Sequence, residues 1–157
     1  MAVTKEEIKT AYPLPVYNYR VDIGETSVAF SEVSGLSISY ETTVYKESPT
    51  ADEKVGPEVM IMPAQSQPPT VSLKKGVVKG VSVAALYQWI MTTKINQVEK
   101  KDIAVHLLNE AGEAVITWKV VDAFPIKLDA PSFTAESNDV AIESMELMAT
   151  SIQIAEA

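Results

Sequence analysis

The sequence predicts a mainly β fold, an antiparallel β-sandwich or small barrel with one packed α-helix. Apolar and polar residues alternate from Tyr17 to Ile23 and from Ile38 to Val44, which is the pattern of strands with one buried face. Turn residues separate such segments, so roughly seven or eight strands are expected. Only the stretch that begins at Ser82 has the periodicity of a packed helix. The 157 residues suit one domain, which we expect to span residues 1–157.

Two segments carry helix signals. Thr4 and Glu7 form a capping-box pattern, which predicts either a short helix over residues 5–11 or a loose N-terminal arm made of residues 1–11. A second helix is expected after Ser82, because apolar residues recur there at helical spacing over about three turns. These apolar residues are Val83, Leu86, Tyr87 and Ile90.

A hairpin and a long loop are the other clear features. The hairpin is expected to pair Asp102–Leu108 with Val115–Val121 around a turn that contains Gly112. Pro125 should bend or end the second strand, because proline cannot donate a ladder hydrogen bond. Residues 46–69 contain five prolines and predict a long irregular inter-strand loop, a type of segment often used for binding.

Composition and charge exclude several classes of function. Thirteen Lys and Arg residues stand against 21 Asp and Glu residues, and the formal charge of -8 disfavours binding to phosphate backbones or anionic lipid. The chain has no cysteine, which excludes disulfides and zinc–thiolate sites and fits a reducing cytosol. The longest mostly apolar stretch, Val81–Met91, is too short to cross a bilayer, so we expect no stable membrane anchoring.

The ionisable residues form no recognisable catalytic pattern. His106 is the only histidine, and Asp102 on the same strand face would lie about 13 Å away, too far for a direct hydrogen bond. We therefore interpret His106 as a structural or interface residue. Glu143 and Glu146 point to opposite sides of an unbroken strand, so they could meet only if a β-bulge lay between them. The apolar residues change from even to odd positions along this strand, which predicts such a bulge near Glu143 and Ser144. We expect no enzyme activity, no cofactor and no metal.

A set of short motifs resembles a known family when the motifs are taken in order. They are YPLPVYNYRVDIG (Tyr12–Gly24), FSEVSGL (Phe30–Leu36), VYKE (Val44–Glu47), LKKG (Leu73–Gly76), YQWI (Tyr87–Ile90), KKDIAVHLLNEAGE (Lys100–Glu113), WKVVDAFPIKL (Trp118–Leu128) and DVAIESMEL (Asp139–Leu147). The set covers nearly the whole chain. It resembles the inner tail tube proteins of contractile-tailed phages and phage-tail-like contractile injection systems.

This resemblance implies a structural role. It implies homohexameric rings, with the inward strands of six copies forming one continuous β-barrel around a channel. The rings would stack into a tube inside a contractile sheath, together with baseplate and terminator proteins. Protein cargo or DNA would pass through the lumen into a target cell. The implied location is the bacterial cytoplasm during assembly and then a phage tail or contractile injection particle, which can be released outside the cell.

The resemblance also suggests a surface for the channel. Polar side chains that hold nothing tightly let cargo pass, and an acidic balance repels DNA. The candidate lumen-facing residues are Ser37, Ser39, Glu41, Thr43, Ser72 and Lys74. The alternative for these residues is the ordinary solvent-facing surface of a monomer.

Residues 46–69 depart from the family pattern, in which a shorter glycine-containing link leads into the LKKG strand. Relatives use this region for contacts between stacked rings. Apolar groups on a long loop need a partner, which is either another ring or the loop's own domain. The candidate ring-stacking contacts are Pro57, Met60, Met62 and Pro63. The alternative function is a monomeric β-rich binding module that uses this loop to hold a partner.

Overall fold

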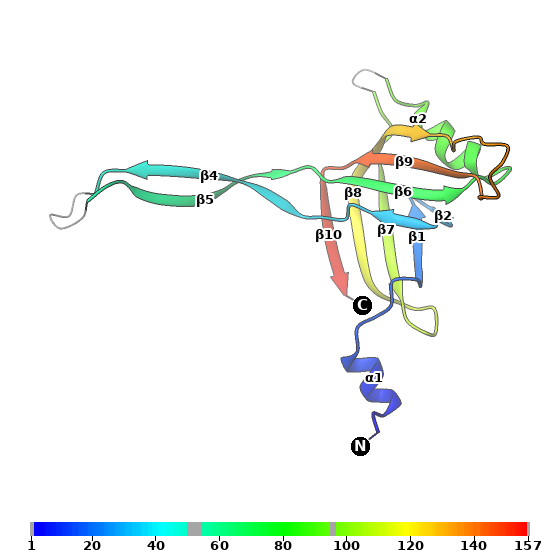
Figure 1. Cartoon of the computed structure of the whole chain (residues 1–157), viewed down its shortest axis with the longest axis horizontal. Helices are drawn as coiled ribbons and strands as arrows, with labels where there is room; N and C mark the ends of the chain where they lie inside the picture. Colours follow the sequence, from blue (N-terminus) through cyan, green and yellow to red (C-terminus); the bar gives the residue numbers. More distant parts are fainter. Residues whose placement is uncertain (1, 50–54, 95–96, 157) are drawn as a thin grey trace.

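The computed structural model describes residues 2–49, 55–94 and 97–156, and these residues form a mainly β protein, as predicted (Figure 1). The strands are β1 (Tyr19–Ile23), β2 (Thr26–Val28), β3 (Glu32–Ser34), β4 (Ser39–Glu47), β5 (Glu58–Gln67), β6 (Thr70–Gly76), β7 (Lys101–Leu108), β8 (Ala114–Asp129), β9 (Ile142–Met148) and β10 (Ser151–Glu156). The helical elements are α1 (Lys5–Ala11), a π-helix η1 (Val83–Tyr87) and α2 (Gln88–Ile90).

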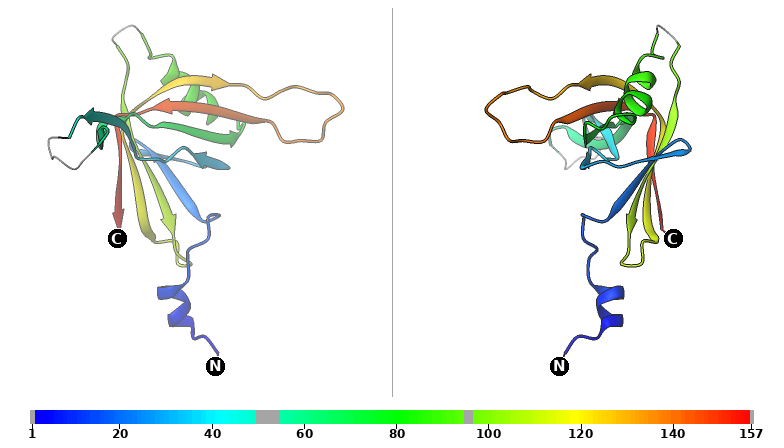
Figure 2. Two further views of the ribbon diagram at one scale, coloured as in Figure 1. Left: turned by 60° about the vertical axis from the view of Figure 1, so that its left-hand side comes forward. Right: turned by 90° about the vertical axis from the view of Figure 1, so that its right-hand side faces the viewer.

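Eight of the strands form two layers that share β8. Layer 1 has the order β2-β1-β7-β8-β10, and layer 2 has the order β8-β9-β6-β3. All of these pairs are antiparallel. The first half of β8 pairs with β7 and β10, and its second half pairs with β9. Figure 2 shows the strands of the two layers crossing at a large angle. The expected sandwich is therefore present, and one continuous strand joins its two sheets.

A β-bulge bends β8 between the layers. At this point β8 advances three residues while β7 advances two. Asp122 lies in the bulge with φ of 52°, and its N–H donates to Asp102 Oδ1 at 3.0 Å. A second register shift lies between Pro125 and Lys127, as expected for a bend at Pro125, whereas β8 continues to Asp129, so the strand does not end at Pro125. Pro125 pairs with Leu147 and is tolerated because the second half of β8 is an edge of layer 2.

One hydrophobic core fills the space between the layers. Val21, Ile103 and Val120 come from layer 1, Leu73 and Leu147 come from layer 2, and each is at most 1% exposed. Each fully buried side chain of this size stabilises the fold by roughly 1.5–3 kcal/mol relative to an exposed one. The packing between the layers therefore fixes which face of each layer points outward.

The second predicted helix is present, but it is shorter than the three turns expected and buries a different face from the one predicted. Leu86 and Trp89 are buried, whereas Val83 and Tyr87 are 58% and 50% exposed. The predicted apolar face is therefore wrong in two of its members. The N–H of Gln88 bonds to the carbonyl of Val83, and such i→i+5 bonding widens the turn that the sequence pattern assumes to be α-helical.

A buried ion pair ties the start of η1 to layer 2. Lys75 Nζ lies 3.4 Å from Glu143 Oε1 and donates to Ser82 Oγ at 3.1 Å. Ser82 Oγ also accepts the Val78 N–H at 3.0 Å, while it makes no hydrogen bond as a helix cap. The hydroxyl predicted to cap the helix therefore holds a buried lysine instead.

The β-bulge predicted near Glu143 and Ser144 is wrong. The register between β6 and β9 runs without a shift from Thr70 opposite Met148 to Gly76 opposite Ile142. The apparent change of phase arises because β9 begins only at Ile142, so the apolar residues before it do not belong to the strand. Glu143 and Glu146 consequently face opposite sides of layer 2.

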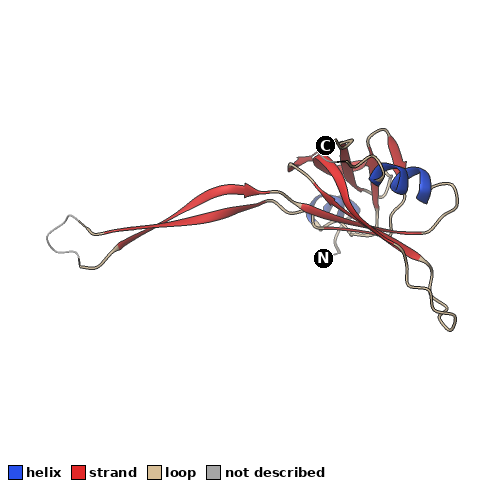
Figure 3. Ribbon diagram, turned by 90° about the horizontal axis from the view of Figure 1, so that it is seen from above, coloured by secondary structure: helices blue, strands red, loops and turns tan. Residues whose placement is uncertain are grey.

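The range 46–69, predicted as an irregular loop, is described over residues 46–49 and 55–69, and residues 50–54 lie outside the described part. Most of the described residues in this range belong to a long hairpin, β4–β5, that projects from the sandwich (Figures 1 and 3). Pro57 precedes β5, and Pro63 lies opposite Thr42 beside a register shift. The prolines are compatible with strands here because β4 and β5 pair only with each other, so each has one edge without a ladder.

The N-terminal helix is confirmed together with its cap. The Glu7 N–H donates to Thr4 Oγ1 at 3.2 Å, and the Thr4 N–H donates to Glu7 Oε2 at 2.8 Å. Helix α1 lies apart from the sandwich, as Figure 1 shows.

Candidate functional site

His106 lies in a polar cluster on the outer face of layer 1. Its Nε2 is 2.9 Å from Asp22 Oδ2, and its Nδ1 is 2.8 Å from Thr117 Oγ1. Because a carboxylate only accepts, Nε2 donates to Asp22, and Nδ1 forms a second hydrogen bond with the Thr117 hydroxyl. The cluster links β1, β7 and β8, which supports the structural interpretation of His106. Asp102 does not contact His106 and instead forms an ion pair with Lys119, with 3.6 Å between Asp102 Oδ2 and Lys119 Nζ.

The carboxyl group of Asp22 is held in its charged form. The Ser27 hydroxyl donates to it, and this bond, together with His106 and Arg20, keeps the pKa of Asp22 below its ordinary value. Among the described residues, no group of three His, Cys, Asp or Glu side chains could hold a metal ion. No helix in the described part of the chain is long and apolar enough to cross a membrane.

The outward face of layer 2 is a polar surface built by four strands. In one row across the strands lie Ser34, Ser72, Glu146 and Lys127, and in the next lie Glu32, Lys74, Ser144 and Asp129. Lys74 Nζ is 3.7 Å from Glu32 Oε2, and Lys127 Nζ is 3.3 Å from Asp129 Oδ2. Two lysines thus face three carboxylates, and both lysines are paired. We call these eight residues the polar face of layer 2.

The candidate lumen residues fall into two separate groups. Ser72 and Lys74 belong to the polar face of layer 2. Ser37 lies in the link that precedes β4, while Ser39, Glu41 and Thr43 lie on β4 itself. The residues of β3, β8 and β9 on this face are not among the residues predicted from the sequence. Their neighbours in space are far away along the chain, so no local pattern marks them.

The β4–β5 hairpin exposes apolar side chains on both faces. Residues directly opposite each other share a face, so Tyr45 and Met60 lie on one side, and Val44 and Ile61 lie on the other. All four are between 40% and 72% exposed. Of the candidate stacking residues, Met60 and Met62 share one face, Pro63 lies on the opposite face, and Pro57 lies just before β5. A two-stranded hairpin with two apolar faces requires cover from outside its own chain.

Layer 2 has two open edges. Within the described part of the chain, β3 pairs only with β6, and residues 124–129 of β8 pair only with β9. The Val77 N–H donates to Ala141 O and the Ala149 N–H donates to Pro69 O, so the odd-numbered residues of β6 bond to β9, and Ser72 and Lys74 bond to β3. The N–H groups of their partners Ser34 and Glu32 therefore point to β6, and the N–H group of Val33 points to the open side of β3. Unpaired strand edges are templates for another strand.

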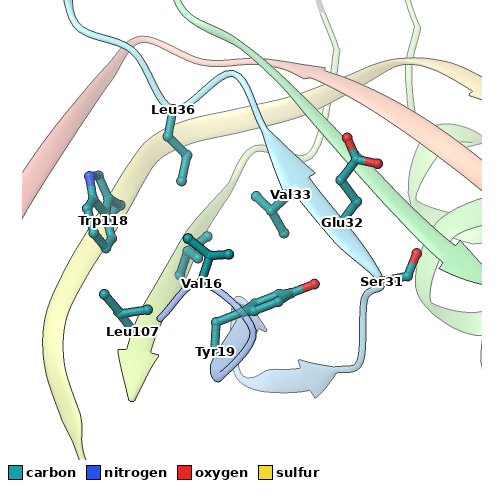
Figure 4. A pocket seen from close by; sticks show the side chains of 9 residues that line it. Val16, Tyr19, Ser31, Glu32, Val33, Leu36, Leu107 and Trp118 are labelled. Carbon is teal, nitrogen blue, oxygen red and sulfur yellow. The ribbon is translucent and has the colours of Figure 1, made fainter. Parts of the chain in front are cut away.

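An apolar pocket of about 440 Å³ opens between the layers (Figure 4). Val16, Leu36, Leu107 and Trp118 point into it, and Glu32 lies at its rim. Tyr19 also lines it, and the Tyr19 hydroxyl is occupied by a hydrogen bond to Phe30 O at 2.7 Å. The pocket therefore offers apolar contact area and no arrangement of reactive groups.

Residues 15–153 of the chain match the family model described as T4-like virus tail tube protein gp19. The chain belongs to the T4-like tail tube protein family. No curated protein matches the chain. The match covers both layers and the hairpin, so the structural features described above are those of a tail tube protein and its role is that of a tube subunit.

Solved structures agree with this assignment of the tail tube protein. One chain, from the PVC sheath-tube complex of an extracellular contractile injection system in the extended state, is 41% identical, with a TM-score of 0.89, and 99% of this chain and 100% of that chain are covered. A chain of the anti-feeding prophage cap, the AFP tube terminating cap, is also 41% identical, with a TM-score of 0.84 and full coverage of both chains. A chain of the PVC sheath/tube terminator is 43% identical, with a TM-score of 0.83, over 93% of this chain and 99% of that one.

Proposed function

We propose that this tail tube protein closes into homohexameric rings through the open edges of layer 2. The layer contributes four strands that alternate in direction from β8 to β3. Because the number of strands is even, the β3 edge of one copy meets the β8 edge of the next in antiparallel orientation. The same join repeated around a ring gives one barrel without free edges. These two open edges are the observation that carries the proposal.

In such a ring the polar face of layer 2 lines the channel. Its outward direction is fixed by the core behind it, and its side chains are serines, two lysines that are each paired with a carboxylate, and Glu146. Ser72 and Lys74 then face the lumen, while Ser37, Ser39, Glu41 and Thr43 extend that surface along the linker and β4. With two lysines against three carboxylates, the wall has no excess of cations to hold DNA, and protein cargo or DNA passes without adhesion.

The β4–β5 hairpin joins one ring to the next. Its two exposed apolar faces supply contact area on both sides, including the candidate residues Pro57, Met60, Met62 and Pro63. Stacked rings form a conduit for cargo delivered into a target cell. The protein acts as a structural subunit without enzyme activity, and its only histidine serves the fold.

The tube works with other proteins. The similar chains come from structures of a sheath-tube complex, a tube terminating cap and a sheath/tube terminator. By analogy, this chain meets sheath, baseplate and terminator proteins. It is made in a bacterial cytoplasm and ends in a contractile injection particle or phage tail.

The test is electron microscopy of the purified protein across a concentration series, together with its mass in solution. We expect six-fold rings with a central hole, and stacks of rings when sheath and baseplate proteins are supplied. A chain that stayed monomeric at every concentration, with those proteins present, would contradict the proposal and favour a monomeric binding module that uses the hairpin.

A further inference from the structure

A second exposed apolar surface lies at the end of layer 2 that is remote from the hairpin. The segment between β8 and β9 encloses a hollow of about 1030 Å³, lined in part by Phe133, Val140 and Ile142. Phe133 is 87% exposed and Val140 is 74% exposed. Val77 lies beside them, because its N–H donates to Ala141 O at 2.9 Å, and it is 48% exposed. We call this hollow and Val77 the apolar end of layer 2.

The hairpin and the apolar end leave the same strands in opposite directions. β6 starts at Thr70, three residues after β5, and finishes at Gly76, which pairs with Ile142 at the start of β9. The strand is about 20 Å long at the usual rise per residue. Figure 1 shows the hairpin on one side of the sandwich and the orange loop between β8 and β9 on the other. The hairpin therefore cannot cover the apolar end of its own chain.

We propose that the hairpin of one copy docks on the apolar end of a copy in the adjacent ring. The occupant is a second copy because each chain carries the hairpin at one end of layer 2 and the apolar surface that fits it at the other end. Such a head-to-tail contact repeats without limit along an axis, as a tube requires. This inference rests on the proposed function and names the receiving surface for its stacking contact.

The chemistry of the two surfaces suits this contact. Met60 and Met62 share one face of the hairpin, and flexible thioether side chains fill irregular apolar hollows and pack well against aromatic rings such as that of Phe133. Glu47 on the hairpin and Glu136 and Asp139 beside the hollow carry the same charge. Apolar contact must therefore supply the attraction, and added salt should lengthen the stacks by screening the repulsion.

A single-site cross-linker tests the receiving surface. The chain has no cysteine, so Met60→Cys introduces one thiol that a benzophenone maleimide can label. Illumination of assembled tubes followed by peptide mass spectrometry should recover the label on the segment from Phe133 to Ile142 of another copy. Label recovered in tubes on another surface, such as the Tyr19 and Trp118 pocket, would overturn this inference and leave stacking intact. A failure to form rings or tubes with unlabelled wild-type protein would instead overturn the proposed function.

A pair of surface variants provides an independent test. Phe133→Ser with Val140→Ser should leave ring formation unchanged and raise the protein concentration needed for stacking by about tenfold or more, because apolar contact area is lost. Val16→Ser with Tyr17→Ser is the matched control, since Val16 and Tyr17 are also largely exposed but lie away from the apolar end. Unchanged stacking in the first variant, or an equal loss in both, would contradict the inference.

Discussion

Lys75 on β6 and Glu143 on β9 form a buried ion pair with 3.4 Å between Nζ and Oε1, and their side chains are only 4% and 11% exposed. Lys75 Nζ also donates to Gly76 O at 2.7 Å and to Ser82 Oγ. The ammonium group is thus surrounded by acceptors from three segments. Through these bonds the ion pair connects layer 2 to the residue that precedes η1.

Removal of one member of this pair should destabilise the protein strongly. Glu143→Leu leaves a buried ammonium group without its counter-charge, and we expect the free energy of unfolding to fall by about 3–5 kcal/mol. Lys75→Met combined with Glu143→Leu should recover most of this loss, because an apolar pair of similar volume needs no compensation. Urea unfolding followed by tryptophan fluorescence measures both. A double variant as unstable as the single one would show that the ion pair is not the source of the effect.

Gly35 should not tolerate a side chain. Its φ is 86°, and a Cβ at this position would overlap the carbonyl oxygen of Thr70 at the crossing of β3 and β6. We expect Gly35→Ala to lower the free energy of unfolding by about 1–3 kcal/mol from backbone strain, with a further loss from the overlap. Gly112→Ala is the control, because Gly112 also has a positive φ but has no atom near its missing Cβ. Equal losses in the two variants, measured by thermal and urea unfolding, would contradict the role of the close approach.

Asp22 should contribute to the loss of stability in acid. Its pKa is lowered in the folded state, chiefly by the Ser27 hydroxyl, so the unfolded chain binds a proton more readily than the folded one. The stabilisation is complete above the ordinary aspartate pKa of about 3.9 and is lost as the pH falls through the lower folded value. The melting temperature of Asp22→Asn should accordingly depend less on pH below about 4 than that of the wild type. If the melting temperatures of both proteins changed in parallel between about pH 2 and 6, Asp22 would not contribute to the loss of stability in acid.

Closure of the ring should depend on the free N–H group of β3. Val33→Pro removes a donor that points to the open edge, while the bonds from β3 to β6 remain. We expect a folded protein that stays smaller than a hexamer in light scattering, whereas Val33→Ala, which keeps the N–H group, still forms rings. Normal hexamers from Val33→Pro would show that ring closure does not use this edge.

The fold was predictable where the signal is local. The strand at residues 19–23, the hairpin of β7 and β8, and the capping box of Thr4 and Glu7 all depend on neighbours in the chain, and the structure confirms them. The strand predicted from the alternation at residues 38–44 is also present, but its predicted buried face is wrong, because every residue of β4 is exposed. The prediction of a loop over residues 46–69 is wrong for the strand residues in this range, because a high proline content does not exclude a strand that pairs on one side only. A hairpin that stands alone has no second neighbour to which its prolines must donate.

The surfaces were predictable only in part, because they depend on pairing across distant strands. Ser72 and Lys74 are predictable because polar residues alternate with apolar ones along their strand. Their neighbours in space, Lys127 and Glu146, lie more than 50 residues away along the chain. The carboxylate partner of His106 likewise comes from β1, 84 residues away. No pattern within a single strand carries that information.

The continuity of β8 through both layers has a mechanical consequence. A tube driven lengthwise experiences shear between its outer and inner parts, and in most sandwiches only side-chain packing resists such sliding. Here a covalent backbone of 16 residues crosses from one layer to the other and is hydrogen-bonded on both sides of the crossing. In the proposed ring, load applied to layer 1 therefore reaches layer 2 through a peptide chain, and we expect the two layers to move as one body.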